Sequence, residues 1–351
     1  MLGFSLMLGS LVSSPPAQIP VLGAEFIAWQ ERFGKAGEYA ALGAGERSAR
    51  FGVWRDNGAF VDAHNAAAAA VGDSYELAMN QFGDRTRAEF RSLHRARSRA
   101  PSLRPAAAAW APPPGAPAPP AKWDWRGRGA VSPVKNQFEP HSCGSCWAFS
   151  AIAGIESRYA MDGHKPAPSF SAQNLVDCTL GGADTCDEGG EMHDGVEQIA
   201  VQQKGAVSTE KDYPTTGLSK GVCHFDAATA VATNVSGYAN VTVGDEDALM
   251  AAVAAGGVIP AGINSDAQAF MFYSSGILNI SAQHCRSGPA ALDHGVAIVG
   301  YGTSAAGVDY WSVKNSYGLY WGEKGYFRIV RGRNSCGIAT DCIVVQGKGA
   351  D

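Results

Sequence analysis

The stretch Cys143-Gly144-Ser145-Cys146-Trp147 decides how this chain is interpreted. Gly144 and Ser145 favour a tight turn, and the apolar spacing that follows predicts a helix over 146–161. Cys146 would open that helix, where unpaired N–H groups and the positive end of the helix dipole stabilise a thiolate. The alternative is that both cysteines are only disulfide partners. The stretch therefore indicates a reactive thiol, which needs a base from elsewhere in the sequence.

Partners for such a thiol lie beside strand-like segments late in the chain. His294 directly precedes the apolar run 296–300, and Asn315 ends another strand-like run. The side-chain oxygen of Asn315 could accept the imidazole N–H and fix its tautomer. Gln137, together with the backbone N–H of Cys146, could bind an oxyanion. Each residue alone is weak evidence, but the set favours nucleophilic catalysis by a Cys-His pair.

The other histidines carry no such signal. His64 and His94 fall in the early helical part, and His164, His193 and His224 lie in polar, turn-like segments that predict surface positions.

Composition excludes several classes of protein. The 351 residues are 46% hydrophobic and 17% charged, so a sizeable core can form. A net charge of −5 argues against a nucleic-acid binder. The sequence has no apolar run of about 18 residues, which argues against a membrane-spanning helix. All eight cysteines follow residue 142, which favours an oxidising compartment for that part.

The chain divides into segments of different composition. The apolar start predicts a signal peptide over 1–23, and 24–100 is rich in helix signals. Residues 101–121 contain eight prolines and predict an exposed linker that neither forms helix nor pairs in a sheet. Residues 122–351 follow, with a helical lobe over 122–230 and a sheet-rich lobe over 231–351. Strand-like runs are 295–301, 310–314 and 325–330. The fold class is therefore α+β.

These features together resemble a zymogen of the papain family of cysteine proteases, on its cathepsin L-like branch. The C-terminal part carries the Cys146 motif and begins near Trp123-Asp124-Trp125-Arg126. The early part carries the propeptide pattern of this branch. Its members here are Glu46, Arg50, Trp54, Asn57, Val61 and Asn65 at helical spacing, then Asn80, Phe82 and Asp84.

The resemblance implies a papain-like two-domain fold, with a helical left domain and a β-barrel-like right domain preceded by a helical, inhibitory propeptide. Cys146 would attack a peptide carbonyl, His294 would be its ion-pair partner and proton donor, Asn315 would orient His294, and Gln137 would bind the oxyanion. The implied disulfides are Cys143–Cys186, Cys178–Cys223 and Cys285–Cys336, which leaves Cys342 unpaired.

The resemblance also implies substrate-binding residues. These are Gly189, Gly190, Met192, Gly262, Leu292, Asp293, Trp321 and Asp341. Asp341 falls at the floor of the S2 pocket, and with Gly262 on its wall the pocket could accept Arg or Lys as well as Leu or Phe at P2. The alternative is that Asp341 turns to solvent or caps a turn.

The sequence departs from the family pattern at Asp187 and Glu188, which lengthen the link before Gly189-Gly190, and at two further places near the predicted site. About three extra residues follow Gln137, and either they project to solvent or Glu139 and His141 narrow the primed side of the cleft. Tyr317 replaces the usual Trp over the Asn-His hydrogen bond. A tyrosine covers that bond with less area and adds a hydroxyl that needs a partner.

Charge suggests how the precursor is activated. Residues 24–115 hold 12 Lys/Arg and 10 Asp/Glu, whereas 122–351 hold 16 and 23, and six of the early arginines lie between Arg85 and Arg99. We expect the basic propeptide to be attracted to the acidic enzyme, and acid to weaken that attraction by protonating carboxylates. Self-processing in the linker is then expected below about pH 5.

The expected product is an acid-active cysteine endopeptidase. The alternatives are a catalytically silent binding or inhibitory relative and a Cys-His acyltransferase. No metal or cofactor is implied. Expected partners are protein and peptide substrates, the chain's own propeptide and cystatin-like inhibitors, with no nucleic acid and no membrane, for a monomer. Three Asn-X-Ser/Thr sequons, at Asn234, Asn240 and Asn279, fit a secretory route to a lysosome, a vacuole or the exterior.

Overall fold

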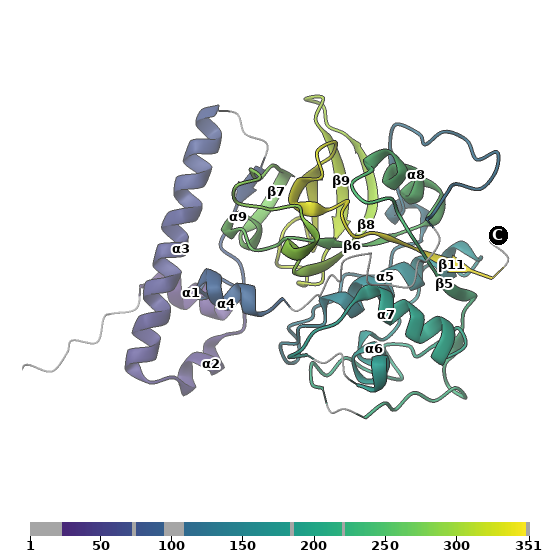
Figure 1. Cartoon of the computed structure of the whole chain (residues 1–351). Helices are drawn as coiled ribbons and strands as arrows, with labels where there is room; N and C mark the ends of the chain where they lie inside the picture. Colours follow the sequence, from purple (N-terminus) through teal and green to yellow (C-terminus); the bar gives the residue numbers. More distant parts are fainter. Residues whose placement is uncertain (1–22, 72–74, 95–108, 183–185, 220–221, 349–351) are drawn as a thin grey trace, which may run out of the picture.

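The computed structural model describes residues 23–71, 75–94, 109–182, 186–219 and 222–348. Nearly all of the predicted signal peptide lies outside these residues, as do residues 101–108 of the linker and Arg95, Arg97 and Arg99. Two units pack side by side, an N-terminal unit (23–94) and a C-terminal unit (109–348) (Figure 1).

The N-terminal unit is built around one long helix. Its elements are α1 (Ala24–Arg32), α2 (Ala36–Ala41), α3 (Ala44–Val71), β1 (Tyr75–Leu77) and α4 (Arg87–Ser92). An aromatic cluster holds α1 and α2 against α3, with Phe26 and Trp29 stacked at a centroid distance of 5.6 Å. The residues predicted to share one helix all lie on α3. One of them, Asn57, donates to the carbonyls of Gly83 and Arg85, both at 2.9 Å.

A buried ion pair completes this unit. Lys35 lies 2.9 Å from Asp84, whose carboxylate also accepts from the hydroxyl of Tyr39 at 2.7 Å. Because both charges are buried and hydrogen-bonded, the loop carrying Asp84 is fixed against α2 and α3.

The helices of the C-terminal unit surround one central helix. They are α5 (Cys146–Met161), α6 (Ala172–Cys178), α7 (Met192–Glu197), α8 (Glu246–Gly256) and α9 (Gln268–Met271), with short turns η2 (Arg126–Arg128), η3 (Thr179–Gly181), η4 (Gln198–Gln202), η5 (Pro289–Ala291) and η6 (Ser335–Gly337). The predicted helix over 146–161 matches the bounds of α5. Most α5 residues are buried, because the helix contributes to both hydrophobic cores of this unit.

The strands form one large open sheet and two small ones. They are β2 (Trp123–Asp124), β3 (Ala206–Val207), β4 (Val231–Ala232), β5 (Val235–Asn240), β6 (Ile259–Ile263), β7 (Tyr273–Leu278), β8 (His294–Thr303), β9 (Asp309–Lys314), β10 (Tyr326–Val330) and β11 (Ile343–Gly347). The large sheet has the order β1-β7-β10-β9-β8-β2, and β6 also pairs with β8. The late strand-like runs of the sequence are thus β8, β9 and β10.

The expected β-barrel-like domain is not a closed barrel in the part of the chain that the structure describes. A barrel closes when its first and last strands pair. Here β1 of the N-terminal unit pairs antiparallel with β7 at one edge, while β2 and β6 both pair with β8 near the other. The mixed helix-and-sheet architecture itself is as expected.

Segments on either side of residue 231 pack across the two predicted lobes. Strand β2, from the start of the helical lobe, joins the large sheet by pairing with β8. Val235, Ile343 and Val345 lie in the hydrophobic core of the helical lobe instead. Each lobe therefore contains a chain segment that belongs by sequence to the other lobe, and these segments hold the two lobes together.

The Pro/Ala-rich linker is less free than its composition indicates. Ala109 forms an isolated bridge with Asn240, and the N–H of Trp110 donates to the carbonyl of Asn240 at 2.7 Å. Trp110 also packs against the main core. The expectation that the segment makes no sheet contact is wrong at this point, because an aromatic residue among the prolines and alanines gains apolar burial.

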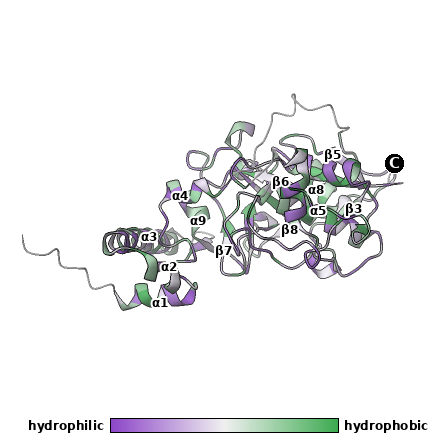
Figure 2. Ribbon diagram, turned by 90° about the horizontal axis from the view of Figure 1, so that it is seen from below, coloured by the Kyte–Doolittle hydropathy of each residue, from purple (hydrophilic) through white to green (hydrophobic). Residues whose placement is uncertain are grey.

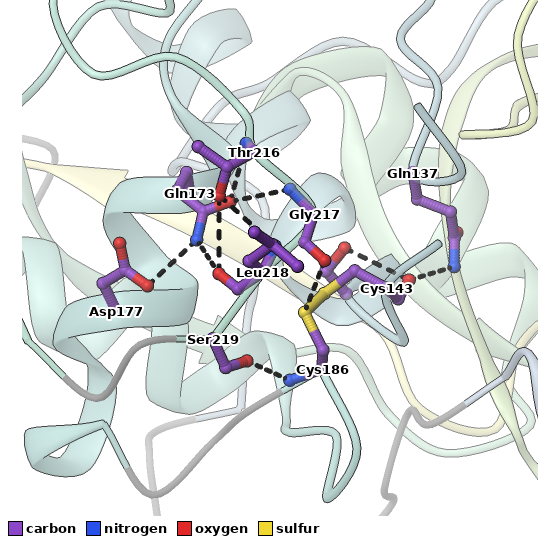
Figure 3. The surroundings of a disulfide bond; sticks show 10 residues. Gln137, Cys143, Gln173, Asp177, Cys186, Thr216, Gly217, Leu218 and Ser219 are labelled. Atoms are coloured by element: carbon purple, nitrogen blue, oxygen red, sulfur yellow. Dashed lines mark hydrogen bonds between the residues drawn. A yellow bond between two sulfur atoms is a disulfide. The ribbon is translucent and has the colours of Figure 1, made fainter. Parts of the chain in front are cut away.

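Three disulfides brace the C-terminal unit, and they are the pairs implied by the resemblance: Cys143–Cys186, Cys178–Cys223 and Cys285–Cys336. Cys146 and Cys342 form no disulfide, and both are buried. Figure 3 shows the first disulfide, which joins the turn before α5 to the segment before α7 and lies beside Gln137. The turn that carries Cys146 is therefore fixed covalently.

The N-terminal unit is attached to the sheet edge by backbone pairing. Tyr75 pairs with Gly276 in the β1–β7 ladder, and the N–H of Ala78 donates to the carbonyl of Phe272 at 2.9 Å. Figure 2, turned by 90° from Figure 1, again shows α1–α3 lying to one side of the C-terminal unit, beyond β7. None of the helices in the described segments has the length and hydropathy needed to span a membrane.

The packing of α5 leads to a stability prediction. A Cβ at Gly154 would lie 2.7 Å from Cγ of Pro260 and 2.8 Å from Cγ2 of Val345, so α5 can approach β6 and β11 this closely only without a side chain. We expect Gly154→Ala to destabilise the protein by about 1–3 kcal/mol through overpacking. Thermal unfolding of the full chain measures the loss.

The matched control is Gly58→Ala on α3, where an added Cβ meets no heavy atom within 4 Å. Alanine there gains about 0.5–1 kcal/mol of helix propensity, so the melting temperature should stay level or rise. A Gly154→Ala protein as stable as this control would contradict the packing argument.

Candidate active site

The turn Cys143–Ser145 places Cys146 at the first position of α5. Ser145 is the N-cap and its side chain makes no capping bond, while the N–H groups of Ala148 and Phe149 donate to its carbonyl at 2.8 and 3.1 Å. The N–H of Cys146 therefore lies in the first turn, where helix N–H groups lack intrahelical acceptors. Cys146 itself is fully buried in the presence of the N-terminal unit.

The start of β8 lies directly against this turn. A Cβ at Gly295 would be 2.9 Å from the carbonyl oxygen of Cys146 and 3.1 Å from Cα of Trp147. The hydroxyl of Ser150 donates to the carbonyl of Val296 at 2.6 Å and fixes the two elements together. Residues Cys146 and His294, distant in sequence, thus belong to one site.

His294 is oriented by an amide from β9. Its Nε2 lies 2.8 Å from Oδ1 of Asn315, and that oxygen also accepts from the N–H of Ser316 at 2.8 Å. An oxygen that accepts from a backbone N–H is fixed as the acceptor, so Nε2 of His294 carries a proton. The other ring nitrogen, Nδ1, is buried and has no hydrogen-bond partner among the described residues. That nitrogen remains available for proton transfer.

Gln137 is held so that its amide lies beside the turn. It is fully buried, its Oε1 accepts from the hydroxyl of Ser316 at 2.7 Å, and its Nε2 donates to the carbonyl of Cys143 at 3.1 Å (Figure 3). An amide nitrogen has two hydrogens, so the second remains for another acceptor. Ser316 therefore connects the His294–Asn315 bond to the Gln137 amide.

The N-terminal unit covers this site with aromatic rings. The Tyr317 ring stacks on His294 at 4.9 Å and contacts Phe82 and Phe90 of the N-terminal unit at 5.5 and 6.1 Å. His94, just after α4, lies edge-on to His294 at 4.8 Å, and its Nε2 is hydrogen-bonded to the hydroxyl of Tyr317. The extra hydroxyl of Tyr317 thus has its partner in the covering unit.

This cover changes the protonation of the site. Burial lowers the pKa of His294 to about 4, against the opposing effect of its hydrogen bond to Asn315. Burial, and then repulsion from His294, places the pKa of His94 well below its ordinary value. Both rings are therefore neutral at moderate pH while the cover is in place. A neutral His294 cannot stabilise a thiolate as an imidazolium does.

Several predicted substrate-binding residues lie close to the start of β8. Gly262 is opposite Gly295 in the β6–β8 ladder, and a Cβ at Gly262 would lie 3.0 Å from Leu292 and 3.4 Å from Asp341. Met192 is buried and accepts a weak hydrogen bond from Ser150. Gly262, Leu292 and Asp341 therefore lie together beside the start of β8, and Ser150 links Met192 to the same strand.

The other candidates of this group have structural partners. The carboxylate of Asp293 accepts from the N–H and hydroxyl of Ser265 at 2.7 and 2.9 Å, and burial raises its pKa to about 6. Trp321 is buried and donates to the carbonyls of Phe270 and Met271. Gly189 and Gly190 are buried, and Gly189 adopts a φ of 70°, which favours glycine.

The alternative that Asp341 turns to solvent is wrong. Its carboxylate lies 3.2 Å from Nε2 of His193, and its side chain is only 12% exposed. His193 is buried, so the sequence-based prediction of a surface position for it is wrong as well. Helix α7 turns this residue inward, and the polar sequence around it gives no sign of that.

The insertion after Gln137 acts through an apolar residue that the sequence did not single out. Glu139 and His141 are exposed, as expected of a segment that projects to solvent. Phe138 instead packs between the two units, 5.2 Å from both Tyr317 and Phe82. Two of the departures from the family pattern therefore meet at one cluster beside His294.

His94 is the second residue of the site that sequence reasoning missed. Its neighbours in sequence are polar and basic, and nothing local distinguishes it from a solvated helix end. Its contact with His294 arises only because α4 docks on the C-terminal unit.

The geometry defines a class: a Cys-His-Asn peptidase whose site is covered by its own N-terminal unit. Residues 119–346 match the family model "Papain family cysteine protease", and residues 26–90 match "Cathepsin propeptide inhibitor domain (I29)". The chain belongs to the papain family of cysteine proteases and carries its inhibitory propeptide. From here the N-terminal unit is called the propeptide.

Curated relatives agree over most of the chain. "Cathepsin L" of Sarcophaga peregrina is 36% identical over 84% of this chain and 85% of its own length. "Senescence-specific cysteine protease SAG12" of Arabidopsis thaliana is 38% identical over 89% and 87%. "Oryzain beta chain" of Oryza sativa is 40% identical over 85% of this chain, which spans 61% of that relative.

Solved precursors share the fold. The digestive procathepsin L2 proteinase of Tenebrio molitor larval midgut has a TM-score of 0.80 at 32% identity, covering 92% of this chain and 98% of its own. A recombinant stem bromelain precursor has a TM-score of 0.77 at 31% identity, covering 93% and 98%. The arrangement of propeptide and enzyme is therefore that of a cysteine protease zymogen.

Ion pairs are a small part of propeptide docking in the described segments. Arg87 and Arg91 lie 3.1 and 3.8 Å from Asp266 of the enzyme. Within the propeptide, the hydrogen bond from Arg50 is the main cause that lowers the pKa of Glu89 to about 2. That pair therefore contributes stability above the ordinary carboxylate range and loses it only as the pH falls toward about 2.

His94 supplies a pH dependence at higher pH than the Arg50–Glu89 pair does. Its pKa is lowered in the docked state, so docking is fully favourable above the ordinary histidine value of about 6.5 and weakens as the pH falls below it. We expect His94→Phe, which cannot be charged, to move the pH midpoint of processing down by about half a unit or more. Processing followed on gels across pH measures this.

The control is Glu89→Gln, which removes a carboxylate that stays ionised throughout this range. It should weaken the propeptide at every pH without moving the midpoint in the direction of His94→Phe. An unchanged midpoint in His94→Phe would show that His94 is not the acid-sensitive contact.

Proposed function

We propose that the chain is the precursor of an acid-activated endopeptidase in which Cys146, His294, Asn315 and Gln137 carry the reaction. The observation that supports this most strongly is the single site formed by the helix N-terminus at Cys146 and the Nε2–Oδ1 bond of 2.8 Å between His294 and Asn315. A positioned nucleophile, base and orienting amide are what acyl transfer through a thiol requires.

In the uncovered enzyme the reaction runs in two halves. The Cys146 thiolate attacks the peptide carbonyl carbon, and the resulting oxyanion accepts hydrogen bonds from the side-chain amide of Gln137 and the backbone N–H of Cys146. His294 gives a proton to the departing amine, leaving a thioester on Cys146. Water, deprotonated by His294, then hydrolyses the thioester and returns the thiolate.

Uncovering changes the chemistry of His294 as well as access to it. Removal of the propeptide admits water to an imidazole whose pKa is lowered by burial. The desolvation penalty then falls, so the imidazolium form becomes accessible beside the thiolate. Activation would therefore create the ion pair at the same time as it opens the cleft.

The substrate-binding residues are proposed as follows. Gly189 and Gly190 would bind substrate backbone, and Met192, Gly262, Leu292 and Asp341 would line the pocket for the P2 side chain. Asp293 and Trp321 would support the walls through the hydrogen bonds described above. The carboxylate of Asp341 would favour a basic P2 residue.

The retained set of four catalytic residues argues against a silent binding protein, and the propeptide argues against a Cys-His acyltransferase. Labelling by a thiol-directed epoxide at Cys146 separates an active enzyme from a silent relative, and product analysis separates hydrolysis from transfer. We further propose a monomer that follows the secretory pathway to a lysosome, a vacuole or the exterior, acts on proteins and peptides, and is open to cystatin-like inhibitors.

The oxyanion role of Gln137 has a measurable size. We expect Gln137→Ala to lower kcat/KM for a peptide substrate by about 10²-fold, since loss of one oxyanion donor removes transition-state stabilisation. The nearby Glu139→Ala is the control, because Glu139 is exposed. Its kcat/KM should stay within about twofold of the parent. A Gln137→Ala enzyme with unchanged kcat/KM would contradict the role.

Self-processing depends on the same thiol. Isolated Cys146→Ala precursor should remain full-length at about pH 4.5, near the carboxylate range, whereas the parent is cut between the propeptide and Trp123. N-terminal sequencing of the acid-treated parent locates the cut. A Cys146→Ala precursor that matures at the parent's rate would exclude self-processing.

A further inference from the structure

The first end of the segment 109–122, here called the strap, extends a small sheet of the enzyme. Ala109 forms a parallel bridge with Asn240 of β5, and the N–H of Trp110 donates to the carbonyl of Asn240 at 2.7 Å. Asn240 is also opposite Ile343 of β11, so the strap adds a third chain to this two-stranded sheet. The side chain of Trp110 packs against the main hydrophobic core. Backbone pairing and apolar burial therefore hold this end together.

The second end of the strap is fixed directly before β2. The hydroxyl of Tyr301, a buried residue of β8, donates to the carbonyl of Pro120 at 2.9 Å. Between the two ends, the N–H of Ala116 donates to the carbonyl of Pro113 at 2.9 Å and closes a turn. Figure 1 shows the strap beside α8, at the end of the molecule away from α1–α3. All of these contacts are made within the C-terminal unit.

The contacts of the strap do not depend on ionised side chains. Residues 109–121 contain no titratable side chain, and both ends are held by hydrogen bonds to backbone carbonyls. Burial raises the pKa of Tyr301, so its hydroxyl keeps the proton that it donates. The propeptide, in contrast, places His94 against the catalytic histidine, where protonation opposes docking. Acid that releases the propeptide therefore leaves the strap in place.

The composition of the strap makes it a poor substrate for the enzyme itself. Residues 111–118 are exposed, which ordinarily favours proteolysis. However, residues 111–121 are only alanine, glycine and proline, so none of them fills the pocket proposed above for the P2 side chain. Each missing methylene in such a pocket lowers kcat/KM roughly tenfold or more. Residues 90–104 contain Phe90, Leu93 and Leu103 instead, which directs cleavage upstream of the strap.

We propose that self-processing cuts the chain before Ala109, and that the mature enzyme keeps residues 109–122 as a docked N-terminal strap. This rests on the proposed function, because the cut is assigned to Cys146. The strap then covers part of the edge of β5, where unpaired N–H and carbonyl groups would otherwise be open to other chains. It also keeps the side chain of Trp110 packed on the enzyme after the propeptide has left.

The test begins with the isolated full-length precursor, incubated at about pH 4.5. N-terminal sequencing and intact-mass measurement of the product should give chains that begin at or before Ala109. Such chains are heavier than a chain beginning at Trp123 by at least the mass of residues 109–122. A product that begins beyond Ala109 would overturn the proposal.

Trp110→Ala tests docking in the matured enzyme. Loss of a packed aromatic ring should lower the melting temperature by about 3–6 °C. The matched control is Ala118→Ser in the exposed part of the strap, which should melt within about 1 °C of the parent. Equal melting temperatures for Trp110→Ala and Ala118→Ser would show that the strap is not docked.

Hydrogen exchange on the matured parent decides the question of docking if Trp110→Ala does not fold. The N–H of Trp110 is hydrogen-bonded to Asn240, so its peptide should exchange at least about tenfold more slowly than one from the exposed residues 115–118. Equal exchange rates would contradict docking. A precursor that stays full-length at every pH contradicts the self-processing endopeptidase, whereas a product that begins at Trp123 contradicts only the retained strap.

Discussion

The close approach of two backbones, at Cys146 on α5 and Gly295 on β8, is the constraint on which the site depends. No side chain fits between them, because a Cβ at Gly295 would lie 2.9 Å from the carbonyl oxygen of Cys146. The helix brings the thiol with its favourable N-terminus, and the strand brings the imidazole with its asparagine. Disulfide Cys143–Cys186 then holds the turn from the other side. The reactive residues are thus positioned by rigid elements of both lobes.

The propeptide inhibits by desolvation as well as by obstruction. Its contacts with the enzyme are mostly uncharged. They are a short strand paired at the sheet edge, hydrogen bonds from the side-chain amides of Asn80 and Gln81 to backbone carbonyls at 2.8 Å, and aromatic rings packed on Tyr317. These contacts exclude water from the site, and the resulting burial lowers the pKa of His294 to about 4. An enzyme that works through a thiolate–imidazolium pair is disabled when neither charge is solvated. Few ion pairs are needed for such a cover.

Sequence could predict whatever depended on local signals or on a well-spaced motif. The start of α5, the strand of His294 and the aligned faces of α3 belong to this group, as do the disulfides implied by resemblance. It could not predict burial created by long-range packing. His94 and His193 stand among polar residues, yet both are enclosed by elements distant in sequence. The edge of the large sheet was equally out of reach, because the strand that pairs there, β1, comes from the propeptide.

The two buried histidines have different consequences because they lie on different sides of the cleavage site. His94 departs with the propeptide, so its protonation acts once, on the step that uncovers Cys146. His193 stays in the enzyme, where its Nε2 lies 3.2 Å from Oδ1 of Asp341. Burial lowers the pKa of His94 in the docked state, so its protonation opposes docking, whereas the pKa of Glu89 is lowered to about 2 by its hydrogen bond from Arg50. Acid would therefore act on the precursor through His94, because a ring that gains a proton cannot stay buried against His294 without a large desolvation cost.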